Sequence, residues 1–391
     1  MTAPAARIAI CGAGPVGLAL AALLARRGVA PQRIRLIDAK PLELAMRDPR
    51  SIALSWGSRQ ILERVRAFPA NHTPIQEIHV SRRGHFGRTM LSSTDHALPA
   101  LGYVCRYGDL VNTLAMAVQS AGIVSLRPKR ILSLDELPDS ARLQLDDGSS
   151  LDAELVVQAE GGIFGEHKHD GRDGRDDRDG HETARDYRQC ALVALVKSDR
   201  APPGRAFERF TEQGPLALLP QEDGYALVWC LRPESAQQLL EASDQEFLRQ
   251  LQQAFGNRVG HFHHAGPRFS YPLGLHTQDP SGARSVAIGN AAQILHPVAG
   301  QGLNLGLRDA EVLARMLAQS PENADPAALL QAYAKARRAD RDLTIRVTDT
   351  LARIFANNAS GQSMLGLSLG LMDVLPPLKR ALARQMMFGR R

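Results

Sequence analysis

The pattern of apolar and polar positions near the N-terminus predicts a strand, a helix and a second strand. Arg7 to Ile10 is a short apolar run, the stretch from Pro15 to about Arg27 suits a helix, and Arg33 to Ile37 is a second apolar run. A strand followed by a helix and another strand forms the βαβ unit of a parallel sheet. We therefore expect an α/β domain at the start of the chain.

The connection between the first strand and the helix carries a dinucleotide fingerprint. It contains Gly12, Gly14 and Gly17, and the second strand is followed by Asp38. The first glycine permits a tight turn, the second a close approach to a pyrophosphate, and the third helix–strand packing, while the acid accepts a bond from a ribose hydroxyl. The pattern predicts dinucleotide binding, with a plain βα turn as the alternative reading. By itself it does not separate NAD from FAD.

A second glycine-rich turn lies at residues 288–311. A β-run from Ser285 to Ile288 ends at Gly289, after which Pro297, Gly300 and Gly302 lead into an amphipathic helix. Glycines let a backbone approach a flat ligand, and a helix N-terminus favours a negative charge. The pattern therefore suits the seat of a flavin. A capped strand–loop–helix connection is the structural alternative.

The rest of the chain alternates between short strands and helices. The segment Gly165 to Arg185 is rich in Asp, Gly, Arg and His, so we expect a mobile loop there. A helical tail runs from Ala327 to Arg391. Short β-rich runs separated by Gly and Pro predict an antiparallel sheet, at Cys190 to Val196, Ala206 to Phe210, Leu216 to Leu219 and Tyr225 to Leu231.

Composition and charge narrow the classes of function. The 391 residues are 44% hydrophobic and suggest two or three domains, without an apolar run of about 20 residues or a signal-peptide pattern, so we expect a cytoplasmic protein. The net charge is +6, but its charges are dispersed and only 5% of the residues are aromatic, so we expect no nucleic-acid-binding module. We expect no metal site, because the cysteines are scattered and the histidines lack ligand spacing; these are Cys11, Cys105, Cys190, Cys230, His167, His169, His181, His261, His263 and His264.

The second glycine-rich turn also carries a family resemblance. Its sequence resembles the second flavin-binding motif of the aromatic hydroxylase family of single-component flavoprotein monooxygenases. The matching residues are Gly289-Asn290-Ala291-Ala292-Gln293, then His296-Pro297, then Gly300-Gln301-Gly302-Leu303-Asn304. It is most similar to the branch that hydroxylates polyprenylated phenols in ubiquinone biosynthesis. Residues 204–210 and 214–220 resemble the same branch, so the resemblance spans most of residues 5–345.

The resemblance implies an α/β fold with three parts. A Rossmann-like FAD-binding domain of the p-hydroxybenzoate hydroxylase type would comprise residues 1–75, 106–180 and 276–345. An antiparallel β-sheet substrate domain would comprise residues 76–105 and 181–275. Residues 346–391 would form a C-terminal helical segment.

The resemblance also implies roles for particular residues. His296, Pro297, Gly300 and Gln301 would position flavin and substrate, and no side-chain base is assigned. In the family, an arginine matching Arg50 lies along the flavin and one matching Arg106 meets its phosphates, with a surface salt bridge and helix capping as the respective alternatives. The complete expected cofactor-binding set is Gly12, Gly14, Gly17, Asp38, Arg50, Arg106, Glu160, Asn290, Gly302, Leu303 and Asn304.

One motif departs from the family pattern. After the strand Leu155 to Val157, relatives carry Gly-Ala-Asp-Gly followed by a serine, whereas this chain has Gln158, Glu160 and Phe164 in place of the first glycine, the aspartate and the serine. In relatives that aspartate serves the ribityl chain and the approach of the nicotinamide. The longer acid therefore leaves the geometry and the preferred reductant open.

The implied activity is FAD-dependent hydroxylation of the ring of a polyprenylated phenol. Non-covalent FAD would be reduced by NAD(P)H, a transient co-substrate because only one dinucleotide fingerprint is present, and would react with O2 to a C4a-hydroperoxide. The alternatives are a reductase of prenyl chains, a halogenase, for which the required W-x-W-x-I-P motif is missing around Trp56 and Trp229, and a catalytically weak accessory subunit of a quinone-biosynthesis complex. The basic amphipathic stretch at 378–388 suits peripheral contact with the inner membrane or a partner, or packing on the flavin domain.

Overall fold

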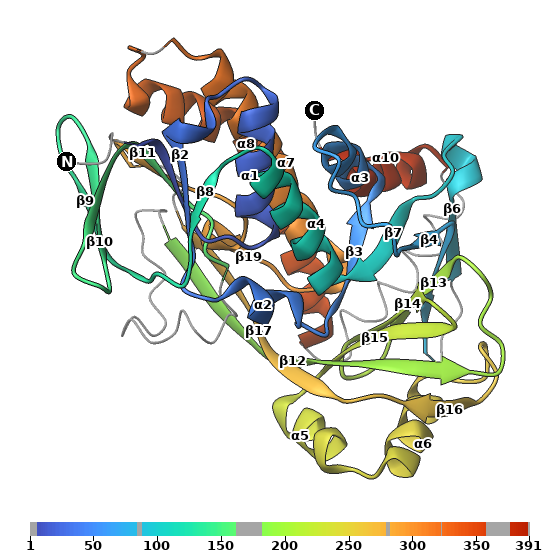
Figure 1. Cartoon of the computed structure of the whole chain (residues 1–391). Helices are drawn as coiled ribbons and strands as arrows, with labels where there is room; N and C mark the ends of the chain where they lie inside the picture. Colours follow the sequence, from blue (N-terminus) through green and yellow to red (C-terminus); the bar gives the residue numbers. More distant parts are fainter. Residues whose placement is uncertain are drawn as a thin grey trace.

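The computed structural model describes residues 6–83, 88–161, 182–278, 282–321, 323–356 and 376–389 (Figure 1). The loop expected at Gly165 to Arg185 lies outside the described residues as far as residue 181. Its predicted C-terminal end is wrong, because β12 (Glu182–Ser198) already begins there. Glu182 pairs with Gln278 of β17 (Phe269–Gln278), and this cross-strand pairing overrides the polar composition.

The expected βαβ unit lies within a seven-stranded sheet, sheet A. Its strand order is β8-β2-β1-β11-β10-β9, and β18 also pairs with β11. The parallel strands are β8 (Val124–Leu126), β2 (Ile34–Ile37), β1 (Ala6–Cys11), β11 (Ser150–Gln158) and β18 (Ser285–Ala287). The antiparallel edge consists of β10 (Ala141–Leu145) and β9 (Ile131–Glu136).

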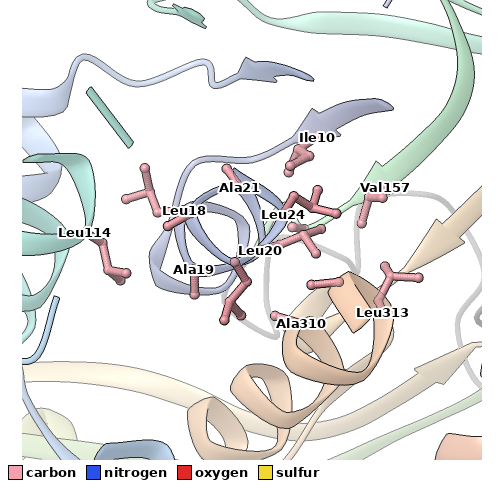
Figure 2. Close-up of a cluster of buried hydrophobic side chains, with 14 of the residues drawn as sticks. Ile10, Leu18, Ala19, Leu20, Ala21, Leu24, Leu114, Val157, Ala310 and Leu313 are labelled. Carbon is pink, nitrogen blue, oxygen red and sulfur yellow. The ribbon is translucent and has the colours of Figure 1, made fainter. Parts of the chain in front are cut away.

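Three helices pack together against one face of sheet A. They are α1 (Pro15–Arg26), α4 (Tyr107–Ser120) and α7 (Gly302–Gln319), and α8 (Pro326–Ala356) packs behind α7. Figure 2 shows α1 at the centre of this core, with Leu20 and Leu24 directed toward neighbouring elements. Burial of these apolar faces supplies the main driving force for assembling the domain.

A larger sheet, sheet C, forms the second layer. Seven of its nine strands are β19 (Gln293–Ile294), β17, β12, β15 (Gly224–Leu231), β14 (Pro215–Gln221), β13 (Arg205–Phe210) and β5 (Glu77–Arg82), and β6 (Arg88–Ser92) and β16 (Phe262–Ala265) complete it. The pairing is antiparallel except between β13 and β5. Helices α5 (Pro233–Glu241) and α6 (Asp244–Phe255) cover its outer face (Figure 1).

A small sheet packs on sheet C, and the C-terminal helix packs beside the small sheet. The small sheet has the order β3-β7-β4, formed by β3 (Ser51–Ser55), β7 (Gly102–Arg106) and β4 (Thr73–Ile75). The C-terminal helix α10 (Pro376–Phe388) packs on α3 (Trp56–Arg64), and its Ala383 and Met387 are buried. The apolar face of this basic helix is therefore used within the protein. One further short helix is α2 (Leu42–Met46).

No helix in the part of the chain that the structure describes is both long and apolar enough to cross a membrane.

The core contact of α1 gives a stability prediction. Leu24 is fully buried, so Leu24→Ala should leave a cavity and lower the free energy of unfolding by about 2–5 kcal/mol. Met116 on α4 is 59% exposed, and Met116→Ala should change it by no more than about 0.5 kcal/mol. Thermal denaturation of both variants beside the wild type measures the difference. Equal melting temperatures would contradict the assigned core.

Candidate cofactor and substrate site

The glycines of the first loop differ in how closely other atoms approach them. Gly12 and Gly17 leave no room for a side chain, whereas Gly14 does. Gly12 has φ +100°, and a Cβ there would lie 2.6 Å from the carbonyl carbon of Ala159. A Cβ on Gly17 would lie 1.9 Å from the carbonyl oxygen of Gly12. At Gly14 the nearest atom to an added Cβ is the Tyr107 hydroxyl, at 3.5 Å. The loop is therefore tightly packed at Gly12 and Gly17, whereas a Cβ at Gly14 would make a single ordinary contact.

Asp38 lies directly beside this loop. Its Oδ2 accepts the N–H of Ala13 at 2.6 Å, and its Oδ1 accepts the N–H of Lys40 at 2.7 Å. Each carboxylate oxygen has two acceptor sites, so both retain capacity for a ribose hydroxyl. Asp38, the residue after β2, is thus able to accept the hydrogen bond from a ribose hydroxyl that the sequence predicts.

Arg127, which the sequence did not single out, also reaches the loop. Its Nη2 donates to the carbonyl oxygen of Ala13 at 2.5 Å and lies 3.7 Å from Asp38 Oδ2. Its Nη1 is buried without a partner among the described residues. An unsatisfied buried N–H is unfavourable, so an anionic ligand in the loop would stabilise this arrangement. Arg127 follows the short strand β8 and belongs to no recognisable motif.

Glu160 and Asn290 lie where the two glycine-rich regions meet. The pKa of Glu160 is raised, first by burial and then by the negative charge of Asp38. The next residue, Gly161, faces Asn290, whose Cβ would be 3.5 Å from an added Cβ at Gly161. These two expected cofactor residues thereby lie close to each other beside the first loop.

His296 has a structural environment. Its Nδ1 accepts the N–H of Val298 at 3.1 Å, and its Nε2 lies 3.2 Å from Gln189 Oε1, so Nε2 carries the proton and donates it. Burial lowers the pKa of His296 to about 4, which keeps the ring neutral near pH 7. Both nitrogens are engaged, so His296 orients the following turn and is not available as a base.

The turn after His296 leads to an open helix N-terminus. Pro297 precedes the 3-10 turn Val298–Gly300, Gly300 has φ +59°, and α7 begins at Gly302. An added Cβ at Gly302 meets no protein atom within 4 Å. Gln301 accepts the first intrahelical bond, from the N–H of Leu305, and its side chain does not cap the helix. The N–H groups of the first turn and the helix dipole therefore suit an anionic ligand edge, as predicted for Gly302 and Leu303.

The side chain of Asn304 is used by the protein itself. Its Nδ2 donates to the carbonyl oxygens of Ala53 and Gly300, at 3.0 and 2.7 Å. Its Oδ1 accepts the N–H of Ser55 and the Ser58 hydroxyl, at 2.8 and 2.7 Å. The Asn304 side chain thus connects β3 and α3 to the start of α7. Of its polar groups, only the backbone N–H remains for a ligand.

The two expected arginines form ion pairs. Arg50 pairs with Asp48, with Nη2 2.6 Å from Oδ2, and its guanidinium carbon lies 4.9 and 5.4 Å from the ring centres of Tyr107 and Tyr271. This position connects β3, α4 and sheet C. The exposed Arg106 pairs with the exposed Glu222 at 2.9 Å. An exposed pair contributes little to stability, so Arg106 can exchange it for a ligand phosphate at small cost.

A small cavity opens beside Gly300 and Gln301. Its volume is about 70 Å³ and most of its lining is apolar, including Ile78, Leu91 and Leu101. Met386 and Met387 of α10 close it on another side. Met side chains are flexible and adapt to irregular apolar ligands. This cavity is the apolar space next to the second glycine turn.

Comparison with known proteins shows the family to which the chain belongs. The family model described as an FAD binding domain matches residues 5–346. The chain is 32% identical to the ubiquinone hydroxylase UbiL of Rhodospirillum rubrum, over 98% of this chain and 89% of that protein. It is 28% identical to the 3-demethoxyubiquinol 3-hydroxylase of Escherichia coli, over 95% of each chain.

Solved structures show the same fold at lower sequence identity. The p-nitrophenol 4-monooxygenase of Pseudomonas putida superposes with a TM-score of 0.75 at 17% identity, covering 99% of both chains. A flavin-dependent brominase gives a TM-score of 0.74 at 14% identity, covering 98% of this chain and 94% of that one. The α/β FAD-binding fold with an antiparallel sheet and C-terminal helices is confirmed. The chain belongs to the FAD-binding domain family and, within it, to the FAD-dependent monooxygenases that include the ubiquinone hydroxylases.

Proposed function

We propose that this protein hydroxylates the aromatic ring of a polyprenylated phenol in ubiquinone biosynthesis, with NAD(P)H and O2 as co-substrates. The observation that carries the proposal is the apolar cavity at Gly300 and Gln301, closed by the methionines of α10, at the open N-terminus of α7. Its relatives are named ubiquinone hydroxylases and monooxygenases of ubiquinone biosynthesis. The apolar lining of this cavity, which is about 70 Å³ in volume, suits part of the apolar chain of such a phenol.

The residues of the groove fit FAD as the cofactor. We assign the pyrophosphate to the loop at Gly12, Gly14 and Gly17, with Arg127 as an additional cation, and the adenosine ribose to Asp38. Supporting this are the single ordinary contact of a Cβ at Gly14 and the buried Arg127 Nη1, which has no partner in the part of the chain that the structure describes. Glu160, Asn290, Arg50 and Arg106 are assigned to the groove between the loop and α7.

The reacting end is assigned to the turn before α7. Pro297, Gly300 and Gln301 shape the surface on which the ring system lies, and the N–H groups of Gly302, Leu303 and Asn304 stabilise negative charge that develops there. His296 holds this turn through Val298. When bound, FAD would supply the activation of O2 with two electrons from NAD(P)H, so that one oxygen atom passes to the ring and the other leaves as water.

A halogenase or a prenyl reductase is less well supported. The brominase shares only 14% identity with this chain. Identity at this level supports a common fold but not a common reaction. The relatives with higher identity carry hydroxylase names.

We further propose that the protein works at a membrane surface, as part of an assembly of quinone-biosynthesis proteins. On α10, Arg380 and Arg384 are exposed while Ala383 and Met387 are buried. The same helix that closes the cavity would thus meet anionic lipid headgroups, beside the path of an apolar substrate.

Substitution in the first glycine loop tests cofactor binding. Gly14→Val should abolish FAD binding, because its branched side chain would occupy the position assigned to the pyrophosphate, whereas an added Cβ makes only an ordinary contact of 3.5 Å with the protein itself. Gly266→Val is a control at an ordinary contact remote from the loop, also 3.5 Å from its nearest neighbour. Absorbance of the purified proteins near the flavin bands measures FAD content. Normal FAD content in Gly14→Val would show that the loop is only a structural turn.

Asp38→Ala separates binding from chemistry. Loss of a bond to a charged acceptor should weaken FAD by about 1.5–3 kcal/mol, roughly ten- to a hundredfold in Kd. With saturating FAD, phenol-dependent NAD(P)H oxidation should return to near the wild-type rate, since Asp38 is assigned to the adenosine end. Fluorescence titration of FAD and steady-state kinetics give the two values. An unchanged Kd would remove Asp38 from the cofactor site.

The membrane proposal is tested with vesicles of phosphatidylcholine and phosphatidylglycerol. Arg380→Gln/Arg384→Gln should reduce sedimentation with anionic vesicles about 30-fold, because each basic residue contributes about 1 kcal/mol. Arg232→Gln/Arg249→Gln, at exposed positions directly before α5 and on α6, is the matched control and should bind as the wild type does. Equal partitioning of all three proteins would exclude α10 as the contact surface.

A further inference from the structure

Glu208 is a carboxyl group on the inner face of sheet C. Its neighbours along β13, Phe207 and Arg209, face α6, since the Phe207 ring centre is 5.5 Å from that of Phe255 and the Arg209 guanidinium lies over the same ring at 5.9 Å. Side chains alternate along a strand. Ala206 indeed packs on the opposite side, against Ala53. Glu208 therefore lies on the face of β13 that is turned toward the small sheet.

The strand register relates Glu208 to the apolar cavity. Ala206 pairs with Ile78 of β5, which lines the cavity together with Gly300. Glu208 is two residues further along β13 and pairs with Val80, a step of about 6.6–6.8 Å on the same face. Ala53 packs with Ala206 and Ile78 and lies 3.6 Å from an added Cβ at Gly300. The carboxyl group thus lies on the same face of sheet C as this part of the cavity wall, one strand step beyond it.

No neighbouring side chain among the described residues bonds to the carboxyl group of Glu208. Among the described residues it has no hydrogen bond or ion pair, yet its side chain is only partly covered. Burial raises the pKa of Glu208 to about 7. Burial also raises the pKa of Cys230 on the neighbouring β15, followed by the negative charge of Glu208.

The charged side chains on the elements around Glu208 have other partners or are exposed. On β5, Arg82 pairs in register with Phe210 and has interactions of its own. Arg50 at the start of β3 pairs with Asp48. Arg106 on β7 pairs with Glu222. On β14, the register partner of Glu208 is the uncharged Ala217. On α10, Arg380 and Arg384 are exposed.

We propose that Glu208 is the proton acceptor for the hydroxyl group of the phenol substrate, an inference that rests on the proposed function. The phenol O–H bond breaks, its proton passes to a Glu208 carboxylate oxygen, and its electron pair stays on the phenol oxygen. That pair raises the electron density of the ring carbons ortho and para to it, which makes the ring a stronger nucleophile. Glu208 later releases the proton to water, so the proton transfer consumes no oxidant or reductant.

The position suits this task for a physical reason. A general base works best when its pKa is close to the working pH and not far below that of the acid. An ordinary glutamate titrates near 4.3 and a phenol near 10, so an exposed carboxylate would be a weak acceptor. A partly enclosed carboxyl group with no internal partner is a better acceptor and is free to bond the substrate.

A binding measurement tests the proposal without turnover. The probe is 4-nitrophenol with a prenyl group at carbon 2, bound to the FAD-loaded, oxidised protein and followed by its visible phenolate absorbance between pH 5 and 10. In the wild type the probe and Glu208 should share one proton, so the band should rise in two steps. Glu208→Gln keeps the shape and removes the acid, and should give a single step. Glu212→Gln, exposed in the following turn, should retain two steps.

Each alternative result has a distinct meaning. One step in all three proteins, or two steps in all three, would overturn the role of Glu208. Failure of the wild type to bind the probe, or to oxidise NAD(P)H in response to a prenylated phenol, would overturn the proposed function and the Glu208 assignment with it.

Turnover gives a second readout. In the wild type, kcat should rise with pH through about 7, because Glu208 must be ionised to accept the proton. In Glu208→Gln this limb should disappear and kcat at pH 7 should fall about 10²–10⁴-fold, while FAD reduction by NAD(P)H stays unchanged. Activity should return in part with the nitrophenol, which ionises unaided. A wild-type pH profile and rate in Glu208→Gln would refute the proposal.

Discussion

The structure depends on the close approach of α1 and α7, which glycine alone permits at their contact. Val16 of α1 lies against Gly289 and Gly306, and a Cβ on Gly306 would be 2.7 Å from the Val16 side chain and 3.0 Å from the Gly289 Cα. Behind it, Gly17 lies against the carbonyl of Gly12. These contacts hold two glycine-rich motifs from opposite ends of the domain at one edge of sheet A, where one extended cofactor can span both.

A buried group of charges secures the second motif. Asp309 accepts the N–H of Gly289 at 3.2 Å and pairs with Arg337 of α8 at 2.7 Å. Arg308 and Arg337 both pair with Asp340 at 2.8 Å. Two arginines thus balance two aspartates in an almost fully buried cluster. Removing one member would leave an unpaired buried charge, which is strongly unfavourable.

The same cluster connects the cofactor turn to the cavity wall. Gln385 of α10 donates to Asp340 at 3.1 Å, and an added Cβ at Gly389 would lie 2.4 Å from Arg308 Nε. The position of the methionines that close the cavity is therefore coupled to the position of α7. The second glycine-rich turn and the apolar cavity are therefore held by one set of contacts.

The sequence by itself determined the features that are encoded locally. Glycine spacing and apolar periodicity act over a few residues, so they predicted the first loop with Asp38, the helix start at Gly302 and the strands of sheet C. Tertiary structure alone decided what depends on partners distant in the chain. Arg127 reaches the loop only because β8 pairs with β2, and Asn304 bonds β3 only because α7 packs there. Glu208 acquires its unusual environment from strands β5 and β14, since burial belongs to neighbours and not to a motif.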